Sequence, residues 1–333
     1  MPPTLGHRFL VDFARQFCDS LVIMLHGSLD DPITLRTRRE WLTREFGGVA
    51  TVVVNTDVPQ PELLDHPDFF SAWGASVLKF MPDHQPPQVI CASNIDAQQL
   101  SGTLGCRFIP VDIARSALNV SASQVLLDPM RHWEMILPCA RPYFLKRVAI
   151  VGPECSGKTV LAQRLALHFN TSWVPEWAAG FRELMAKRWD ELSMEDIELI
   201  ARGQRASEKA LAMQANRILF SDTDVCTLEL LSAMRWNQPS PTLRRMSGTH
   251  KADLYIVANP ATPWKNDPEG SPPDLAPRSE FFQNLLQHLE RKGLSFTIVE
   301  GNWNQRYQAG IAAVDLLMGN TRREAPLPGP LVR

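Results

Sequence analysis

A glycine-containing segment at residues 152–159 constrains the fold of this chain more than any other feature. It reads G-x-x-x-x-G-K-T, follows a short apolar run at residues 148–151, and precedes a stretch with helical spacing of apolar residues at 160–169. The two glycines let successive backbone N–H groups turn inward, and a helix N-terminus adds partial positive charge. This order of strand, loop and helix predicts a phosphate-binding loop, the P-loop, and a chain that binds ATP or GTP.

The residue types of the loop indicate separate roles. We expect Lys158 to reach the β- and γ-phosphates of ATP and the Thr159 hydroxyl to ligate Mg²⁺, so ATP and Mg²⁺ are the expected cofactors. The alternative is a strand–helix turn that matches the pattern without binding a nucleotide. The expected ATP-binding residues are Gly152, Pro153, Glu154, Cys155, Ser156, Gly157, Lys158 and Thr159.

Composition narrows the class of protein. A length of 333 residues predicts two domains, and a formal net charge of −2 gives no indication of nucleic-acid binding. The six cysteines form no C-x-x-C pair, which favours reduced thiols over disulfides or zinc ligands. We find no run of eighteen apolar residues and no signal-peptide pattern, so we expect a cytoplasmic protein without a membrane partner. Homo-oligomerisation stays open.

Strands alternate with helices along the whole chain. In the first half, apolar or β-branched runs at 21–25, 51–55, 89–91 and 108–111 predict strands, and helical patterns lie between several of them. Such alternation is typical of an α/β fold with parallel sheets. Prolines at 138–142 place a domain boundary near residue 145. We therefore expect domains at 1–145 and 146–318, and a disordered proline- and arginine-rich tail at 319–333.

An acidic residue ends a second predicted strand of the C-terminal half. Residues 217–221 lead into Asp222, in the manner of a Walker B strand. We expect Asp222 to hold Mg²⁺ or to accept the proton of a substrate hydroxyl, with Asp224 as its partner, and both roles stay open. An aspartate that only caps the strand end is the alternative. No glutamate directly follows Asp222, which argues against a motor ATPase. No Asn-Lys-x-Asp follows the strand at 254–257, which argues against a GTPase. The pattern therefore favours phosphoryl transfer to a small acceptor.

Several motifs of the N-terminal half point to a known family. Residues 4–7 read T-x-G-H and resemble the (H/T)xGH motif of nucleotidyltransferases, although a capping Thr4 with a surface His7 would look the same. Together with 27–31, Trp73, 111–112, 120–124 and 128–134, they make the chain similar to the NadR family, bifunctional enzymes with a nicotinamide-mononucleotide adenylyltransferase domain and a ribosylnicotinamide kinase domain. The likeness extends to about residue 318. It implies a Rossmann-type nucleotidyltransferase sheet followed by a P-loop kinase fold.

The resemblance implies roles in the first domain and also shows two departures. Thr4 and His7 would contact ATP phosphates, Trp73 would stack on nicotinamide, and the segment around Ser121 would touch phosphate. The family's strand before T-x-G-H has no counterpart here, so either the true start lies upstream or this domain has decayed. In addition, Leu126 stands where the family has a triphosphate-binding arginine. Loss of such a charge-assisted contact costs about 1.5–3 kcal/mol. We therefore expect a weak or absent adenylyltransferase activity.

In the second domain, residues 174–178 resemble the V-P-E-Y-A segment that receives the nucleoside. By this likeness Glu176 would bind ribose hydroxyls or the metal, and Trp177 would offer an aromatic face to the cationic nicotinamide ring. Core packing of Trp173 and Trp177 is the alternative. Arg182 would replace an arginine that the family carries at the position of Ala179.

A proline-rich stretch at 267–278 resembles the family's lid. Arg278 would close over the transferring phosphate, whereas the earlier lid motif at 267–270 lacks its arginine, and a solvated linker is the alternative. A DNA-binding helix-turn-helix that some family members carry is absent from the sequence, so we expect no repressor role and no nucleic-acid partner.

Taken together, the sequence predicts a kinase that converts nicotinamide riboside into nicotinamide mononucleotide with ATP. If the first domain is intact, adenylylation to NAD would follow. The alternatives are a kinase for another nucleoside and a non-catalytic nucleotide sensor.

Overall fold

The computed structural model describes residues 1–27, 31–58, 66–238, 240–260 and 275–319. Its contacts divide the chain into two compact units, Met1–Tyr143 and Phe144–Arg333, which are described separately. Every ladder between the named strands is parallel, so the expected α/β class with parallel sheets is confirmed. The lid motif at 267–270 and residues 320–333 of the predicted tail lie outside the described residues.

The first unit contains two separate pairs of strands. β1 (Val22–His26) pairs with β2 (Thr51–Asn55), and β3 (Val89–Ala92) pairs with β4 (Arg107–Pro110). Within the described residues no strand joins the two pairs. Met24 of β1 and Ile90 of β3 nevertheless pack into the same apolar cluster. The helices of this unit are α1 (Leu5–Ala14), α2 (Leu35–Phe46), α3 (Phe69–Phe80), α4 (Asp96–Leu104), α5 (Ala122–Leu127), the short 3₁₀ helix η2 (Trp133–Met135) and α6 (Arg141–Phe144) at the boundary.

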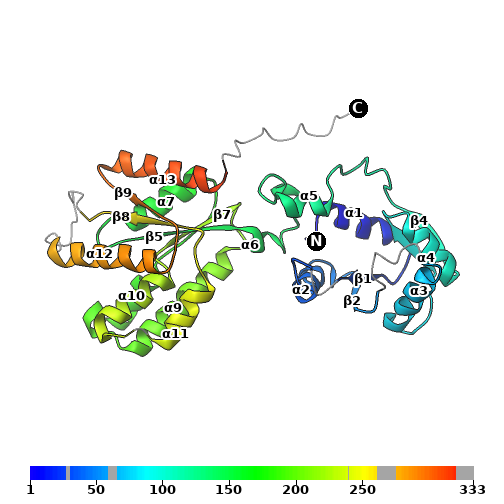
Figure 1. The fold of residues 1–333 in the computed structure, drawn as a ribbon, viewed down its shortest axis with the longest axis horizontal. Coiled ribbons are helices and arrows are strands. Elements are labelled where there is room, and N and C mark those ends of the chain that lie inside the picture. Colours follow the sequence, from blue (N-terminus) through cyan, green and yellow to red (C-terminus); the bar gives the residue numbers. More distant parts are fainter. Residues whose placement is uncertain (28–30, 59–65, 239, 261–274, 320–333) are drawn as a thin grey trace. The chain divides into compact units, whose positions relative to one another are not determined.

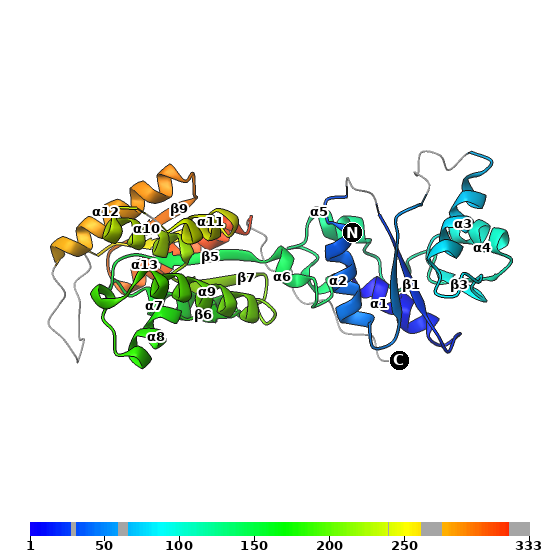
Figure 2. The ribbon, with the colours of Figure 1, turned by 90° about the horizontal axis from the view of Figure 1, so that it is seen from below.

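The second unit is built on one parallel sheet with the strand order β6-β7-β5-β8-β9. The strands are β5 (Lys146–Val151), β6 (Trp173–Val174), β7 (Ile218–Asp222), β8 (Leu254–Ala258) and β9 (Phe296–Val299). Figure 2 shows β6 and β9 at opposite edges of this sheet. The helices are α7 (Lys158–His168), α8 (Trp177–Met185), η3 (Trp189–Glu191), α9 (Met194–Leu211), α10 (Val225–Trp236), α11 (Pro241–Thr249), α12 (Leu275–Arg291) and α13 (Trp303–Leu317).

Alternation along the strands divides the core of this unit into two layers. Val148 and Ile150 of β5 belong to the cluster that includes α7 and α13, whereas Ala149 and Val151 belong to the cluster under α10 and α12. Figure 1 shows these two pairs of helices on opposite faces of the sheet. A third cluster joins α8, α9 and α10. Because all five strands are parallel, their carboxyl ends meet at one edge, where ligands of open α/β sheets bind.

In the described part of the chain, no helix combines the length and the apolar character that crossing a bilayer requires.

Candidate functional site

The P-loop follows β5 directly and has a backbone that only glycine tolerates at two points. Gly152 has a φ of +147°, and a Cβ there would lie 2.8 Å from the carbonyl oxygen of Ala258 at the end of β8. Gly157 has a φ of +82°, and a Cβ there would overlap the indole ring of Trp303. Side chains at either position would therefore push the loop away from its neighbours.

Two side chains of the P-loop turn back onto its own backbone. The Lys158 ammonium donates to the carbonyl oxygen of Pro153 at 2.9 Å, and the Ser156 hydroxyl donates to the same oxygen at 2.8 Å. Lys158 is also the first residue of α7, so its charge lies at the positive end of that helix. The loop thus concentrates donors and positive potential where phosphate oxygens would bind.

Thr159 and Asp222 meet beneath the P-loop. The Thr159 hydroxyl donates to Oδ2 of Asp222 at 2.5 Å, and Oδ1 of Asp222 is buried without a hydrogen-bond partner among the described residues. Asp222 is 0% exposed, and burial raises the pKa of its carboxyl, which the Thr159 hydrogen bond and the Lys158 charge oppose. A hydroxyl beside a buried carboxylate with one uncommitted oxygen is a set of ligands that suits Mg²⁺ held jointly with nucleotide phosphates.

Glu176 belongs to the same electrostatic environment. It precedes α8 as the N-cap, without a side-chain capping bond. Burial raises the pKa of its carboxyl, the Lys158 charge lowers it, and the charges of Asp222 and Glu154 raise it again. The structure therefore brings Glu176, Asp222 and Lys158 close enough for their charges to act on one another.

Trp177, the first residue of α8, packs against helix α9. Its ring stacks on Phe181 with centroids 5.4 Å apart, and a Cβ at Gly203 of α9 would overlap the indole. Its backbone N–H donates to Oε1 of Gln204 at 2.9 Å. Core packing thus accounts for one face of this half-buried ring.

Gln204 is a link that sequence patterns did not indicate. It is 2% exposed, accepts from Trp177, and its amide nitrogen lies 3.5 Å from the carbonyl oxygen of Asp222. The side chain therefore spans the predicted nucleoside segment and the end of β7. A single buried glutamine inside an amphipathic helix gives no local signal of such a role.

Asp224, the expected substrate-binding partner of Asp222, has several hydrogen-bond partners within the protein. Oδ1 of Asp224 accepts from the backbone N–H and the hydroxyl of Thr227, at 3.0 and 3.1 Å, and Oδ2 accepts from the Tyr255 hydroxyl at 2.8 Å. Both oxygens are engaged, and the residue is the N-cap of α10. Thr223 has a φ of +71°, so the backbone turns between Asp222 and Asp224. Of these two aspartates, Asp222 is the one that accepts a hydrogen bond from Thr159 of the P-loop in the described part of the chain.

Arg278, the predicted lid arginine, contacts the P-loop. Its Nε and Nη2 donate to the carbonyl oxygens of Glu154 and Cys155, at 3.1 and 3.3 Å. Arg182 of α8 forms an ion pair with the Glu154 side chain at 3.4 Å. Two cations thus flank the loop from helices α12 and α8.

A buried arginine that sequence patterns did not indicate also holds the loop. Arg306 of α13 is 2% exposed, and its guanidinium donates to the carbonyl oxygens of Ser156, Asn259 and Gly301, at 2.7, 2.6 and 3.2 Å. It has no ion pair among the described residues, and burial followed by the charge of Arg278 lowers the pKa of its guanidinium. The negative charge of a phosphate bound at the P-loop would compensate this buried positive charge.

The predicted adenylyltransferase residues lie in the first unit. Thr4 and His7 form a capping pair at the start of α1, with Oγ1 of Thr4 2.9 Å from Nδ1 of His7. Burial lowers the pKa of His7 to about 4, aided by the positive charges of the amino terminus and Arg115. The imidazole is therefore neutral at pH 7.

The other two residues of that predicted site lie in different settings. Trp73 of α3 faces His26 edge-on with ring centroids 5.9 Å apart, and its Nε1 is buried without a partner in the described part of the chain. Ser121 caps α5 through Gln124. No hydrogen bond or ring contact between described residues joins Trp73 or Ser121 to the Thr4–His7 pair. Residues 28–30 of the resembling segment 27–31 lie outside the described residues.

Comparisons with known proteins found one family model and several relatives. Residues 147–306 match the family model described as an AAA domain. The trifunctional NAD biosynthesis/regulator protein NadR of Escherichia coli (strain K12) is 26% identical over 338 residues, which cover 96% of this chain and 82% of the relative. Its counterpart from Salmonella typhimurium (strain LT2) is also 26% identical, over 96% of this chain and 81% of its own length.

Two solved structures share the fold. A crystal structure of NadR protein in complex with NR is 21% identical, has a TM-score of 0.80, and covers 98% of this chain and 95% of its own. A NadR structure in complex with NAD and AMP-PNP has a TM-score of 0.77 at 21% identity, over 97% of this chain and 95% of that one. At this identity the likeness shows the fold.

Proposed function

We propose that this chain, which is 26% identical to the NadR relative over 96% of its length, transfers the γ-phosphate of ATP to the 5′-hydroxyl of nicotinamide riboside. This similarity and the P-loop support a nucleotide-metabolising enzyme of NAD biosynthesis. The choice of nicotinamide riboside is supported by the NadR relative that was crystallised with NR.

One observation carries the kinase proposal. The Thr159 hydroxyl and the buried Asp222 carboxylate meet at 2.5 Å directly under the P-loop, and one carboxylate oxygen is left without a partner among the described residues. Metal-assisted phosphoryl transfer requires this combination, because the metal must contact a P-loop hydroxyl, an acid at a neighbouring strand end and the phosphates together. Mg²⁺ bound there would neutralise charge on the β- and γ-phosphates.

The protein side chains then have distinct tasks. Lys158 leaves the Pro153 carbonyl oxygen and binds the β- and γ-phosphates, while Arg278 stabilises charge on the transferring group. Glu176 holds ribose hydroxyls, and Trp177 presents the ring face that is not covered by Phe181 and Gly203. The 5′-oxygen forms a bond to the γ-phosphorus as the bond to the bridging oxygen breaks, its proton passes to a carboxylate of the site, Asp222 or Glu176, and ADP leaves. Catalysis is mostly positioning and charge neutralisation.

We do not extend the proposal to adenylyl transfer. The four strands of the first unit form two separate pairs within the described residues, and Leu126 occupies the place of a phosphate-binding arginine. Both features weaken a triphosphate site. The first unit is therefore proposed to contribute little or no NAD synthesis of its own.

The test compares turnover of nicotinamide riboside with that of uridine and cytidine under Mg·ATP. We expect kcat/KM for nicotinamide riboside to exceed the others by at least about 100-fold, since a polar-specific nucleoside site rejects analogues strongly. Preference for uridine or cytidine would identify a different nucleoside kinase. Tight ATP binding without phosphorylation of any nucleoside would instead support a nucleotide sensor.

A further inference from the structure

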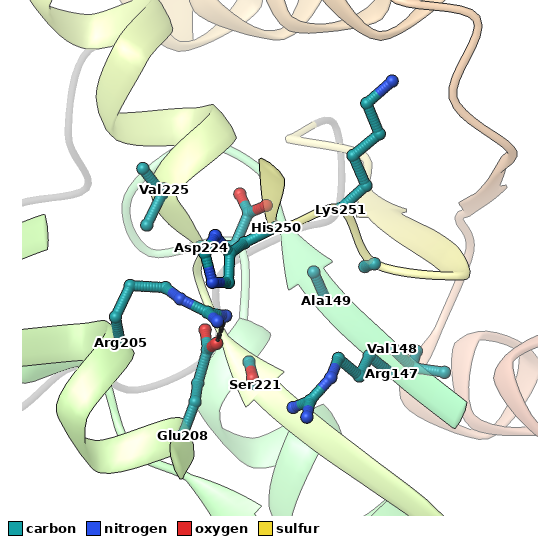
Figure 3. A pocket seen from close by; sticks show the side chains of 11 residues that line it. Arg147, Val148, Ala149, Arg205, Glu208, Ser221, Asp224, Val225, His250 and Lys251 are labelled. Carbon is teal, nitrogen blue, oxygen red and sulfur yellow. Dashed lines mark hydrogen bonds and ion pairs between the residues drawn. The ribbon is translucent and has the colours of Figure 1, made fainter. Parts of the chain in front are cut away.

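A second pocket lies in the C-terminal unit on the face of the sheet away from Thr159 and α7. Arg147 of β5, Ser221 of β7, and Arg205 and Glu208 of α9 line it, with His250 at its rim. The pocket is a partly open depression, and the space between its walls, open solvent included, is about 320 Å³. Figure 3 shows the guanidinium groups of Arg147 and Arg205 approaching Ser221 from opposite sides, while the Lys251 side chain extends away from the pocket.

Strand geometry explains why polar side chains gather on this face. Arg147 and Ala149 are two positions apart on β5, so they point to the same side of the sheet. Ser221 pairs in register with Ala149 and points to the face opposite that of its neighbour Asp222. The pocket is therefore separated from the Thr159–Asp222 contact by the thickness of the sheet.

The acids around the pocket already have partners. Glu208 forms an ion pair with Arg205. Asp224 uses both oxygens on Thr227 and Tyr255, and Asp253 accepts from Lys146 and from the backbone N–H of Arg147. These three carboxylates near the pocket therefore already have hydrogen-bond or ion-pair partners within the protein.

Two hydrogen-bond donors that face the pocket have no acceptor among the described residues. In the part of the chain that the structure describes, the Arg147 guanidinium makes no hydrogen bond or ion pair, and the Ser221 hydroxyl makes no hydrogen bond. Arg147 is half-buried, and burial lowers the pKa of its guanidinium, which the nearby charges of Glu208 and Asp253 oppose. Arg205 donates one N–H to the Glu208 carboxylate, and a guanidinium has further N–H groups that can donate to a ligand. A half-buried cation next to an uncommitted hydroxyl and a second guanidinium calls for an oxyanion.

We propose that this pocket is a binding site for a phosphate group, either inorganic phosphate or the phosphate of a small monoester. Arg147 and Arg205 supply N–H donors, Ser221 supplies a hydroxyl at the floor, and His250 lies at the open side. A tetrahedral dianion matches two guanidinium groups on opposite sides better than a planar monoanionic carboxylate does. The site is distinct from the P-loop and is compatible with bound nucleotide.

Phosphate also binds P-loops, so the test fills that site first. Full-length protein is saturated with Mg·AMP-PNP at pH 8 and constant ionic strength, where the imidazole of His250 is neutral because burial lowers its pKa below the usual 6.5. Inorganic phosphate is titrated while the His250 ring resonances are followed by NMR, assigned with His250→Gln. We expect a saturable shift of His250, and none with acetate at the same ionic strength.

Substitutions at Arg147 and Ser221 test whether these residues bind the phosphate. Arg147→Met is expected to weaken phosphate binding by at least about 10-fold, and Ser221→Ala by about 5-fold, as expected for a charged and a neutral hydrogen bond. Arg164→Met, at an exposed arginine of α7, serves as the matched control and leaves the titration unchanged. Ribose 5-phosphate is titrated in parallel; tighter binding than inorganic phosphate assigns a monoester, and the reverse assigns the free ion.

Three results would overturn the proposal. His250 could fail to shift, it could respond equally to phosphate and acetate, or Arg147→Met could bind phosphate as tightly as the parent. If Arg147→Met does not fold, Ser221→Ala still distinguishes the outcomes. Because the P-loop is occupied throughout by AMP-PNP, failure of this test says nothing against the kinase proposal, and failure of the kinase assay leaves this site standing.

Discussion

The Arg306 guanidinium donates a 2.7 Å hydrogen bond to the carbonyl oxygen of Ser156, which lies 150 positions earlier in the chain. The same group binds the carbonyl oxygens of Asn259 and Gly301, so one buried side chain ties the P-loop to the ends of β8 and β9. Donors aimed at these carbonyls hold the loop with its N–H groups turned the other way, toward phosphate.

Arg306→Met should therefore damage stability and ATP affinity together. It removes the donor to the carbonyl oxygen of the buried Ser156, at a cost of about 1–3 kcal/mol in the free energy of unfolding. We also expect ATP affinity to fall by about 10-fold or more, because a buried positive charge beside the phosphates is lost. Urea unfolding and calorimetric titration with Mg·ATP measure the two effects. Arg306→Lys should restore part of the affinity, and unchanged binding in both variants would contradict this role.

Arg278→Met should separate catalysis from binding. Among the described residues, Arg278 donates to the carbonyl oxygens of Glu154 and Cys155 and belongs to no core cluster, so its removal leaves the core intact. We expect kcat to fall roughly 100-fold, the usual scale for a lost donor that stabilises transition-state charge. The dissociation constant for ATP should change by less than about 3-fold. A variant with normal kcat would show that another cation serves the transferring phosphate.

Asp222→Asn should make the ligand-free protein more stable at neutral pH while abolishing activity. Burial raises the pKa of Asp222 in the folded state, so the folded protein holds this proton more tightly than the unfolded chain does. Ionisation as the pH rises through the folded pKa then lowers the free energy of unfolding of the parent, and the neutral asparagine escapes this loss.

The stability difference between parent and Asp222→Asn should thus be small at acid pH and grow toward neutral pH. Urea unfolding at a series of pH values from 5 to 8, without nucleotide, measures it. Saturation with Mg·ATP should shrink the difference, because the metal compensates the buried charge. A variant that is less stable than the parent across this range would contradict the burial argument.

Gly203→Ala tests the placement of Trp177. A methyl group at residue 203 would overlap the indole, so the ring must move. We expect KM for nicotinamide riboside to rise several-fold, with KM for ATP unchanged. Gly180→Ala in α8 is the matched control: a Cβ there meets nothing within 4 Å, and alanine should stabilise the helix by about 1 kcal/mol. Equal KM values in both variants would indicate that Trp177 only packs the core.

The sequence predicted those parts of the site that are encoded locally. The P-loop depends on consecutive residues, and Asp222 ends a strand whose apolar run is visible in the sequence. Such features depend on spacing along one segment, which is why pattern analysis finds them.

The parts that pattern analysis missed depend on long-range contacts or on single torsion angles. Arg306 and Gln204 act through carbonyl oxygens far away in the chain, which leave no local signature. Asp224 was paired with Asp222 because of its proximity in sequence, yet a positive φ at Thr223 sends it to Tyr255 instead. The strands of the first unit begin and end near the predicted residues, but their association as two separate pairs is a tertiary property.

The most direct measurement is an assay with nicotinamide riboside and Mg·ATP that quantifies ADP, nicotinamide mononucleotide and NAD separately, for the parent and for Lys158→Ala. We predict that the parent forms ADP and the mononucleotide in equal amounts with little or no NAD, and that Lys158→Ala is at least about 100-fold slower. Mononucleotide formation by Lys158→Ala at the rate of the parent, or ADP release without mononucleotide, would contradict the account.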